Sequence, residues 1–313
     1  MPQCIVNINH VKFVFLLGII LPNFAVAAFP DLGVGVRPLG MGGAYIAVSD
    51  DSNATFWNAA GLTQIQGSEF TASYSILYAG LNAQLFNQDI DQLGYHFVSY
   101  AQPIGNPSNV VATSFLFFDS AFYQEQTYLF SFAKQIWPAV RGGMNAKYLR
   151  TNVTETPYIT ADPFLAEIDL TQSATTIDLS LFYAYSDHIS LGITGHNLLP
   201  ADIGVLETMH LPIKVGFGAA HKTQKYTQAI DFIWRQGRIN GQPIRAIRFG
   251  LERWFLNRQI GVRTGYNVDS ATVGASVAYG ETYQIQLDYA FIYPISSITD
   301  TMGSHRFGFS VRF

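Results

Sequence analysis

The feature that most constrains this chain is an alternation with a period of two residues, which begins near Ser68 and continues to the last residue. It runs in stretches of about ten residues, in which apolar side chains alternate with polar or small ones. A period of two places successive side chains on opposite faces of an extended strand. In the last stretch, one face carries Phe307, Phe309, Val311 and Phe313, and the other carries Arg306, Gly308, Ser310 and Arg312. The pattern predicts strands with one large apolar face and one polar face.

Composition separates the two folds that use such strands. A soluble β-sandwich turns the apolar face inward and a membrane barrel turns it toward lipid, so the alternation alone fits both. Charged residues make up only 13% of the chain, about half the usual share in a soluble domain. Hydrophobic residues make up 49% and aromatic residues 14%. Disorder is therefore excluded, and helical spans are disfavoured because later apolar runs are broken within about ten residues. We expect an all-β transmembrane antiparallel barrel.

The spacing of the stretches predicts about fourteen strands, although twelve or sixteen also fit. The predicted strands are residues 68–78, 93–103, 109–119, 126–136, 138–150, 173–187, 188–197, 211–221, 226–236, 243–254, 258–267, 270–280, 281–293 and 305–313. Odd-numbered connections such as 79–92 and 151–172 are long, whereas even-numbered ones such as 187–188 are short. This difference is typical of barrels with both termini in the periplasm. The first strand must then pair with the last, because lipid offers no partners for a free edge.

The first 28 residues resemble a secretory signal peptide. Lys12 is their only charged residue, residues 13–21 form a short apolar core, and Ala25 and Ala27 have the spacing that signal peptidase requires. A membrane anchor is the less favoured alternative, because the core is short and Pro22 interrupts it. Cleavage would remove Cys4, the only cysteine. We then expect a mature protein without a disulfide or a cysteine-ligated metal.

The last predicted strand ends on Phe313. An aromatic residue in this position resembles the signal by which outer-membrane barrels are passed to the barrel-assembly machinery. We therefore expect Phe313 to act in assembly, and we expect the mature protein in the outer membrane of a Gram-negative type of cell, in contact with lipid.

A glycine-rich segment without strand alternation precedes the first strand. Residues 33–62 resemble the N-terminal signature of the PorV-like branch of the FadL superfamily of outer-membrane proteins. The matching residues are Arg37, Gly40, Met41, Gly42, Gly43, Ala44, Asp50, Asp51, Asn58, Ala60, Gly61 and Leu62. Ala59 stands where the family signature has proline. The resemblance implies a hatch inside a fourteen-stranded barrel, and residues 43–48 also fit a short helix.

The expected organisation is a signal peptide in residues 1–28, a hatch in 29–66 and a barrel in 67–313. Charged residues of the polar face would then line the lumen, because an arginine or lysine facing the bilayer midplane costs about 2–4 kcal/mol. The predicted lumen-lining residues are Arg141, Lys147, Asp178, Lys214, Asp231, Arg248, Glu252, Arg263 and Asp288. We expect them to approach one another or the hatch.

No motif in the sequence predicts an enzyme, a cofactor or a metal site. Gly-x-Ser-x-Gly and His-Glu-x-x-His are absent, although a catalytic triad assembled across strands would not be visible in the sequence. His188 and His196 are eight residues apart in one predicted stretch, about 26 Å, which is too far to share a metal. The acidic run at Asp50 fits a turn or helix cap better than a calcium loop. A formal charge of −4 without a basic block excludes nucleic-acid binding.

Two functions follow from the resemblance. The FadL side implies transport of a hydrophobic small molecule across the outer membrane. The PorV side implies a shuttle that binds exported proteins in type IX secretion. The hatch either plugs the barrel or gates a conduit. The third class is a barrel enzyme, but the sequence contains no recognisable group of catalytic residues that would support it.

Overall fold

The computed structural model describes residues 32–80, 84–85, 88–89, 93–105, 109–121, 123–155, 169–205, 208–237, 242–280, 283–295 and 301–313. The predicted signal peptide lies outside these residues, as do parts of the long connections.

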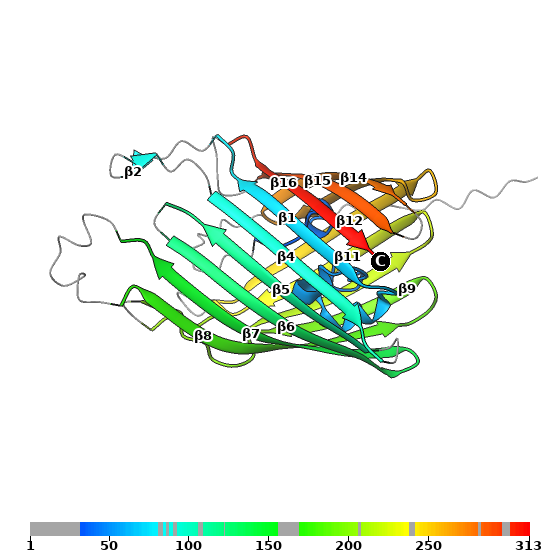
Figure 1. Cartoon of the computed structure of the whole chain (residues 1–313), viewed down its shortest axis with the longest axis horizontal. Helices are drawn as coiled ribbons and strands as arrows, with labels where there is room; N and C mark the ends of the chain where they lie inside the picture. The colour runs from blue at the N-terminus through cyan, green and yellow to red at the C-terminus, as the bar shows by residue number, and fades with distance from the viewer. Residues whose placement is uncertain are drawn as a thin grey trace, which may run out of the picture.

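The described residues form one closed antiparallel barrel of fourteen strands (Figure 1). Its strands are β1 (Glu69–Leu77), β4 (Leu93–Pro103), β5 (Asn109–Asp119), β6 (Tyr123–Trp137), β7 (Val140–Val153), β8 (Thr171–Ala184), β9 (Ile189–His196), β10 (Lys214–Lys222), β11 (Tyr226–Arg235), β12 (Ile244–Phe255), β13 (Ile260–Asn267), β14 (Ser270–Tyr279), β15 (Gln284–Pro294) and β16 (Ser304–Arg312). A short hairpin, β2 (Gln84–Leu85) and β3 (Gln88–Asp89), lies in the first connection. The predicted fold class is confirmed.

The ring closes between the first and last strands of the barrel. β1 pairs with β16 from Glu69 opposite Arg312 to Ile76 opposite His305. The pairing continues past the strand ends, where Ser68 N donates to Phe313 O over 2.8 Å and Phe313 N donates to Ser68 O over 3.0 Å. The predicted pairing of first and last strands is therefore correct. Among the described residues, no helix is both long enough and apolar enough to cross a membrane.

The two faces of the wall differ as the alternation predicts. Large apolar side chains cover the outside; Phe130 is 62% exposed and Val277 60%. Aromatic rings touch one another around part of this surface, with centroids 4.8 Å apart for Phe115 and Tyr128 and 6.1 Å apart for Tyr128 and Tyr148. Small and polar side chains face inward and are buried. This outer surface suits the lipid interior and the aromatic girdle of a membrane barrel.

The two ends of the barrel carry different connections. The end that holds Ser68 and Phe313, here called the turn end, has the short connections 104–108, 138–139, 185–188, 223–225, 256–259 and 280–283. The opposite end, here called the loop end, has the long ones. Connections 120–122 and 268–269 at the loop end are as short as the turns, so the predicted difference does not hold everywhere. At the second of these, Asn267 Oδ1 accepts from Asp269 N and Ser270 N and stabilises a tight turn.

Residues 32–66, here called the N-terminal segment, lie inside the ring of strands (Figure 1). They form α1 (Val36–Gly40), α2 (Ala54–Trp57) and the 3-10 helix η1 (Ala59–Gln64). α1 packs on β13 to β16, whereas η1 packs on β5 to β8, so the segment touches opposite parts of the wall.

Residues 43–48, whose sequence is compatible with a short helix, do not form one. Gly42 and Gly43 have φ angles of 65° and 76°, in the left-handed region, and so end the helical path. The amides of Tyr45 and Ile46 donate to Asp231 on the wall instead of to a helix.

Candidate functional site

The nine charged residues predicted to line the lumen all lie on the inward face of their strands. On each strand, these charged residues alternate with side chains that point outward. Their face of the strand contacts the N-terminal segment, lines the pocket described below, or contacts another inward side chain. They divide into a turn-end group around Arg37, a middle group and a loop-end group.

Arg37 of α1 is the centre of the turn-end group. Its Nε and Nη2 donate to the two oxygens of Glu252 on β12, over 2.8 and 2.9 Å. Its Nη1 donates to Asp50 over 2.5 Å, to Tyr45 Oη over 2.7 Å and to Asp51 over 3.0 Å. Arg37 is 5% exposed and Glu252 2%. One guanidinium therefore joins the N-terminal segment to the wall and organises two acidic residues of the predicted hatch motif.

The ion pairs continue along the wall on both sides of Arg37. Arg263 Nε donates to Glu252 over 2.7 Å, and Arg263 Nη1 donates to Asp288 over 3.0 Å. On the other side, Lys222 of β10 bonds to Asp50. The result is a chain of alternating charges that runs from Asp288 to Lys222 and is buried except at Lys222, whose side chain is 38% exposed.

These ion pairs also determine the ionisation of Asp50 and Arg37 in the N-terminal segment. Burial alone would raise the pKa of Asp50, but the charges of Arg37 and Lys222 hold that pKa well below its usual value. Burial alone would lower the pKa of Arg37, but the carboxylates of Asp50 and Glu252 raise it well above its usual value. The pairs are therefore ionised at neutral pH.

The middle group holds the segment through backbone atoms. Asp231 of β11 is fully buried and accepts from Tyr45 N over 2.8 Å and Ile46 N over 3.0 Å. Asn58 Nδ2 donates to Ile46 O over 2.8 Å and to Leu181 O of β8 over 3.1 Å.

The remaining motif residues allow close contact between backbones. A Cβ at Gly61 would lie 2.2 Å from Ser49 O, and a Cβ at Gly42 would lie 2.6 Å from Tyr266 N of β13. Met41 is fully buried, and its oxygen lies close to Gly250 of β12.

Two more motif glycines lie beside the wall charges. Gly40 is next to Arg263 and the backbone of Gly274, and Gly43 lies between Trp57 and Arg248. Arg248 of the middle group stacks on Trp57, with Cζ 5.5 Å from the ring centroid.

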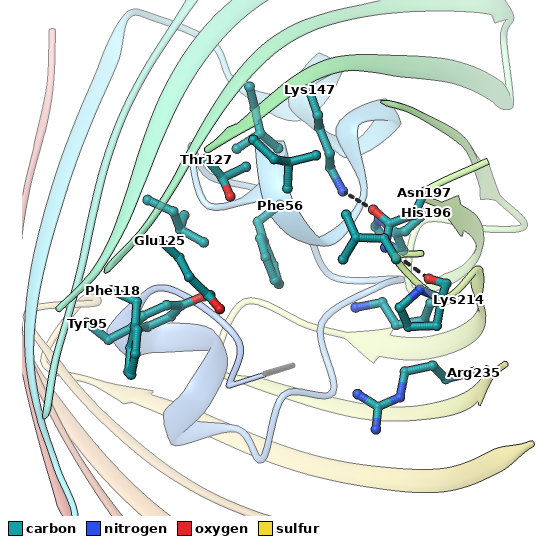
Figure 2. A pocket seen from close by; sticks show the side chains of 15 residues that line it. Phe56, Tyr95, Phe118, Glu125, Thr127, Lys147, His196, Asn197, Lys214 and Arg235 are labelled. Atoms are coloured by element: carbon teal, nitrogen blue, oxygen red, sulfur yellow. Dashed lines mark hydrogen bonds between the residues drawn. The ribbon is translucent and has the colours of Figure 1, made fainter. Parts of the chain in front are cut away.

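A pocket lies between the N-terminal segment and the loop end (Figure 2). It holds about 770 Å³ of empty space, including the part open to solvent. Phe56 of α2 projects into it from the segment. Its lining on the β4 to β6 side is mostly apolar, with Glu125 and Thr127 as polar residues, and it is mixed elsewhere. The lining residues are Phe56, Tyr95, Leu116, Phe118, Glu125, Thr127, Leu129, Lys147, Leu149, His196, Asn197, Leu211, Pro212, Lys214 and Arg235.

Asp178 of β8 organises one edge of this pocket. Its Oδ2 lies 2.8 Å from Lys147 Nζ and 3.1 Å from His196 Nδ1, and its Oδ1 accepts from Asn197 N over 2.9 Å. Asn145 Nδ2 donates to the same carboxylate over 3.1 Å. The predicted residues Lys147 and Asp178 therefore meet, and the structure adds His196.

The connection between β9 and β10 folds back over the pocket. Ala201, Ile203 and Leu211 are buried there and pack on Leu149 of β7. Asn197 Nδ2 donates to Pro212 O over 3.0 Å and ties the two ends of the connection together. Asn197, Leu211 and Pro212 of this connection line the pocket.

Two of the predicted lumen residues contact rings. Lys214 Nζ lies 5.4 Å from the ring centroid of Phe56, in the pocket. Arg141 lies near the turn end, with Cζ 5.1 Å from the ring centroid of Phe182, and takes no part in the pocket.

Several residues at the site escaped the sequence analysis. Lys222 has the same parity as Lys214 in one alternating stretch, so its inward direction was visible in the sequence. Glu69 and Arg312 pair over 2.5 Å at the barrel closure, and Glu69 accepts from Ser52 N over 2.9 Å, which no local pattern indicates. In the described part of the chain, no cluster of three or more histidine, cysteine or acidic residues could hold a metal ion.

Comparison with solved structures identifies similar barrels. The toluene transporter TbuX of Ralstonia pickettii has a TM-score of 0.67 at 12% identity, covering 91% of this chain and all of that one. The monoaromatic hydrocarbon channel CymD has a TM-score of 0.64 at 14% identity, covering 91% and 97%. A Pseudomonas aeruginosa FadL homologue has a TM-score of 0.58 at 12% identity, covering 88% and 96%. No protein-family model and no curated protein sequence matches this chain. The chain therefore shares the fold of FadL-type transport barrels.

Proposed function

We propose that this chain is an outer-membrane transport protein that passes a hydrophobic small molecule across the membrane. The observation that carries the proposal is the loop-end pocket, which is enclosed by the barrel wall and by Phe56 of the N-terminal segment. Pockets for small molecules are concave and mostly apolar, with a few polar groups that orient the ligand. The lining has this character, because Leu116, Phe118 and Leu129 lie beside a few charged side chains.

The fold supports the same function. The similar structures are described as toluene transporters and a monoaromatic hydrocarbon channel. The pocket lies at the loop end, and the long loops of such barrels face the exterior of the cell. This position supports capture of the small molecule from outside the cell.

The N-terminal segment serves as the hatch in this proposal. Barrels much wider than eight strands are not filled by wall side chains alone, so a barrel of fourteen strands needs an internal plug. Arg37 and the amides of Tyr45 and Ile46 attach the segment to β11 and β12. The hatch motif Arg37, Gly40, Met41, Gly42, Gly43, Asp50, Asp51, Asn58 and Gly61 supports placing the chain in the PorV-like branch.

The second candidate is a PorV-like shuttle that binds an exported protein in type IX secretion. It requires an outward docking surface at the loop end. The described part of the connection between β9 and β10 supports transport instead, because Ala201, Ile203 and Leu211 pack on Leu149 and Leu211 also lines the pocket.

A pair of neighbouring substitutions tests transport. Thr127 lines the pocket, and the adjacent Tyr128 is exposed on the outer surface. We expect Thr127→Trp to fill the pocket and lower uptake of radiolabelled toluene by cells at least about tenfold, and Tyr128→Trp to leave uptake unchanged. Both variants must show normal outer-membrane abundance. Equal uptake by the two variants would remove the pocket from the transport route.

A further inference from the structure

A cluster of aromatic and basic side chains lies on the outer surface of the barrel, at the turn end of β10 to β12. The rings of His221 and Tyr226 have centroids 5.6 Å apart, and the ring of His188, from the turn before β9, lies 6.1 Å from that of His221. Tyr226 is directly opposite Arg253 in the register of β11 and β12. Arg253 Cζ lies 4.9 Å from the ring centroid of Phe255. These five residues are here called the basic girdle.

The basic girdle lies where the apolar outer surface ends. Phe217, Phe249 and Leu251 are exposed on the same outer face, nearer the middle of the barrel. Arg253 follows Leu251 on the outward face of β12, two residues before the strand ends at Phe255. Membrane barrels carry girdles of aromatic residues at both interfaces, where their apolar band meets the lipid headgroups. The basic girdle is therefore at headgroup depth, and the apolar surface beside it is at the depth of the acyl chains.

The charge of this rim is positive. The described residues of β9 to β12 include no carboxylate on the outward face, because Asp231 and Glu252 both point inward. In the part of the chain that the structure describes, none of the ion pairs includes Arg253 or Lys225, which is exposed in the turn between β10 and β11. Asp187 is the one exposed carboxylate in the described turns beside the girdle. Two permanent positive charges therefore face one negative charge.

A ligand at this position contacts two kinds of surface at once. Guanidinium groups bind phosphate oxygens through paired hydrogen bonds, and Arg253 is exposed on the outward face. The hydroxyl of Tyr226 and the ring nitrogens of His221 are further hydrogen-bonding groups beside it. The neighbouring surface of Phe249 and Leu251 favours an apolar partner. A phosphate that carries acyl chains has both properties, whereas a soluble anion or an uncharged lipid has only one.

We propose that the basic girdle binds an anionic glycerophospholipid of the membrane leaflet at the turn end, with its phosphate at Arg253 and its acyl chains along Phe249 and Leu251. The positive rim favours a headgroup without a compensating ammonium group, because basic residues near a membrane surface attract anionic lipids. The site is on the outside of the wall, apart from the loop-end pocket. The inference therefore goes beyond the proposed transport of a small molecule.

Two lipids with the same acyl chains test the headgroup selectivity. Dioleoylphosphatidylglycerol, which is anionic, and dioleoylphosphatidylcholine, which is zwitterionic, are titrated separately into the purified barrel in an uncharged detergent. Native mass spectrometry counts the lipid molecules that each barrel retains. We expect phosphatidylglycerol to bind about tenfold more tightly than phosphatidylcholine, because of the charge of its headgroup.

Two arginines on the same face of β12 locate the site. Arg253→Gln removes the guanidinium at the turn end and should lower the preference for phosphatidylglycerol to about twofold. Arg245→Gln is the matched control, because Arg245 is exposed on the outward face of the same strand at its loop end. It should leave the preference at about tenfold. Heat-modifiable migration, and a urea midpoint that is unchanged without added lipid, confirm that each variant is folded.

Each other outcome contradicts a stated part of the proposal. Equal affinities for the two lipids would show that the basic girdle does not select an anionic headgroup. If Arg245→Gln lowers the preference as much as Arg253→Gln, the lipid is not held at the turn end. Displacement of phosphatidylglycerol by inorganic phosphate at equal concentration would identify a site for a soluble anion. None of these results bears on transport, which the uptake measurement on Thr127→Trp tests separately.

Discussion

The guanidinium of Arg37 and the carboxylate of Glu252 form two parallel hydrogen bonds across 215 positions of the sequence. The pair joins α1, inside the barrel, to β12 of the wall. Both groups are buried, and Glu252 also accepts from Arg263. Because a buried charge without its partner is costly, loss of this contact would weaken the attachment of the N-terminal segment to the wall.

Arg37→Met is expected to destabilise the folded protein by about 3–5 kcal/mol, because it leaves buried carboxylates uncompensated. The measurement is the urea midpoint of the purified barrel, followed by the loss of heat-modifiable migration. Arg253 lies on the exposed face of β12, the strand that holds Glu252. Arg253→Gln should change the free energy of unfolding by less than about 0.5 kcal/mol. Equal midpoints for the two variants would contradict a structural role for Arg37.

Deleting residues 33–62 is expected to convert a closed barrel into an ion-conducting one. The segment packs on β5–β8 and on β13–β16 from inside the ring, and the wall side chains of a barrel this wide do not fill its interior alone. Conductance in planar bilayers is the measurement. If the deletion changes conductance little, the segment does not plug the barrel. The shuttle function would then be better supported than transport.

Acid is expected to open the barrel only below about pH 4. The pKa of Asp50 lies below its usual value of 3.8, because Arg37 and Lys222 stabilise the carboxylate. The stabilisation by these pairs is therefore complete above about pH 4 and is lost as the pH falls through the lowered pKa. Bilayer conductance should stay low between about pH 8 and pH 5 and rise below about pH 4. Asp50→Asn should weaken closure at neutral pH and remove this dependence. A wild-type leak that begins near pH 6 would show that another group controls closure.

Phe313→Ser is expected to lower the yield of barrel in the outer membrane far more than its stability. Phe313 is half-exposed, and its backbone alone makes both hydrogen bonds to Ser68, so the substitution removes little from the folded structure. Abundance in outer-membrane fractions is compared with the urea midpoint of the purified variant. Normal abundance would exclude a role of the side chain in assembly.

The strands and their faces follow from the sequence alone. Alternation with a period of two is a local property, so the printed residues already separate Phe309 from Ser310. For the same reason the inward direction of Lys147, Asp178 and Glu252 was predictable before any contact was known. The turn at residues 268–269 shows the limit, because strand number indicated a long connection and local side-chain bonds determined a short one.

The contacts inside the barrel required the tertiary structure. The register of β9, β10 and β11 places Lys214 opposite both Arg235 and His196, which are 21 and 18 positions away in the sequence. Leu211 and Pro212 of the connection between β9 and β10, together with Phe56, then complete the pocket. The sequence determined which side chains turn inward, because strand geometry is local. Only the tertiary structure decided which of them meet, because that depends on strand register, ring closure and the path of the N-terminal segment, all of which involve residues far apart in the chain.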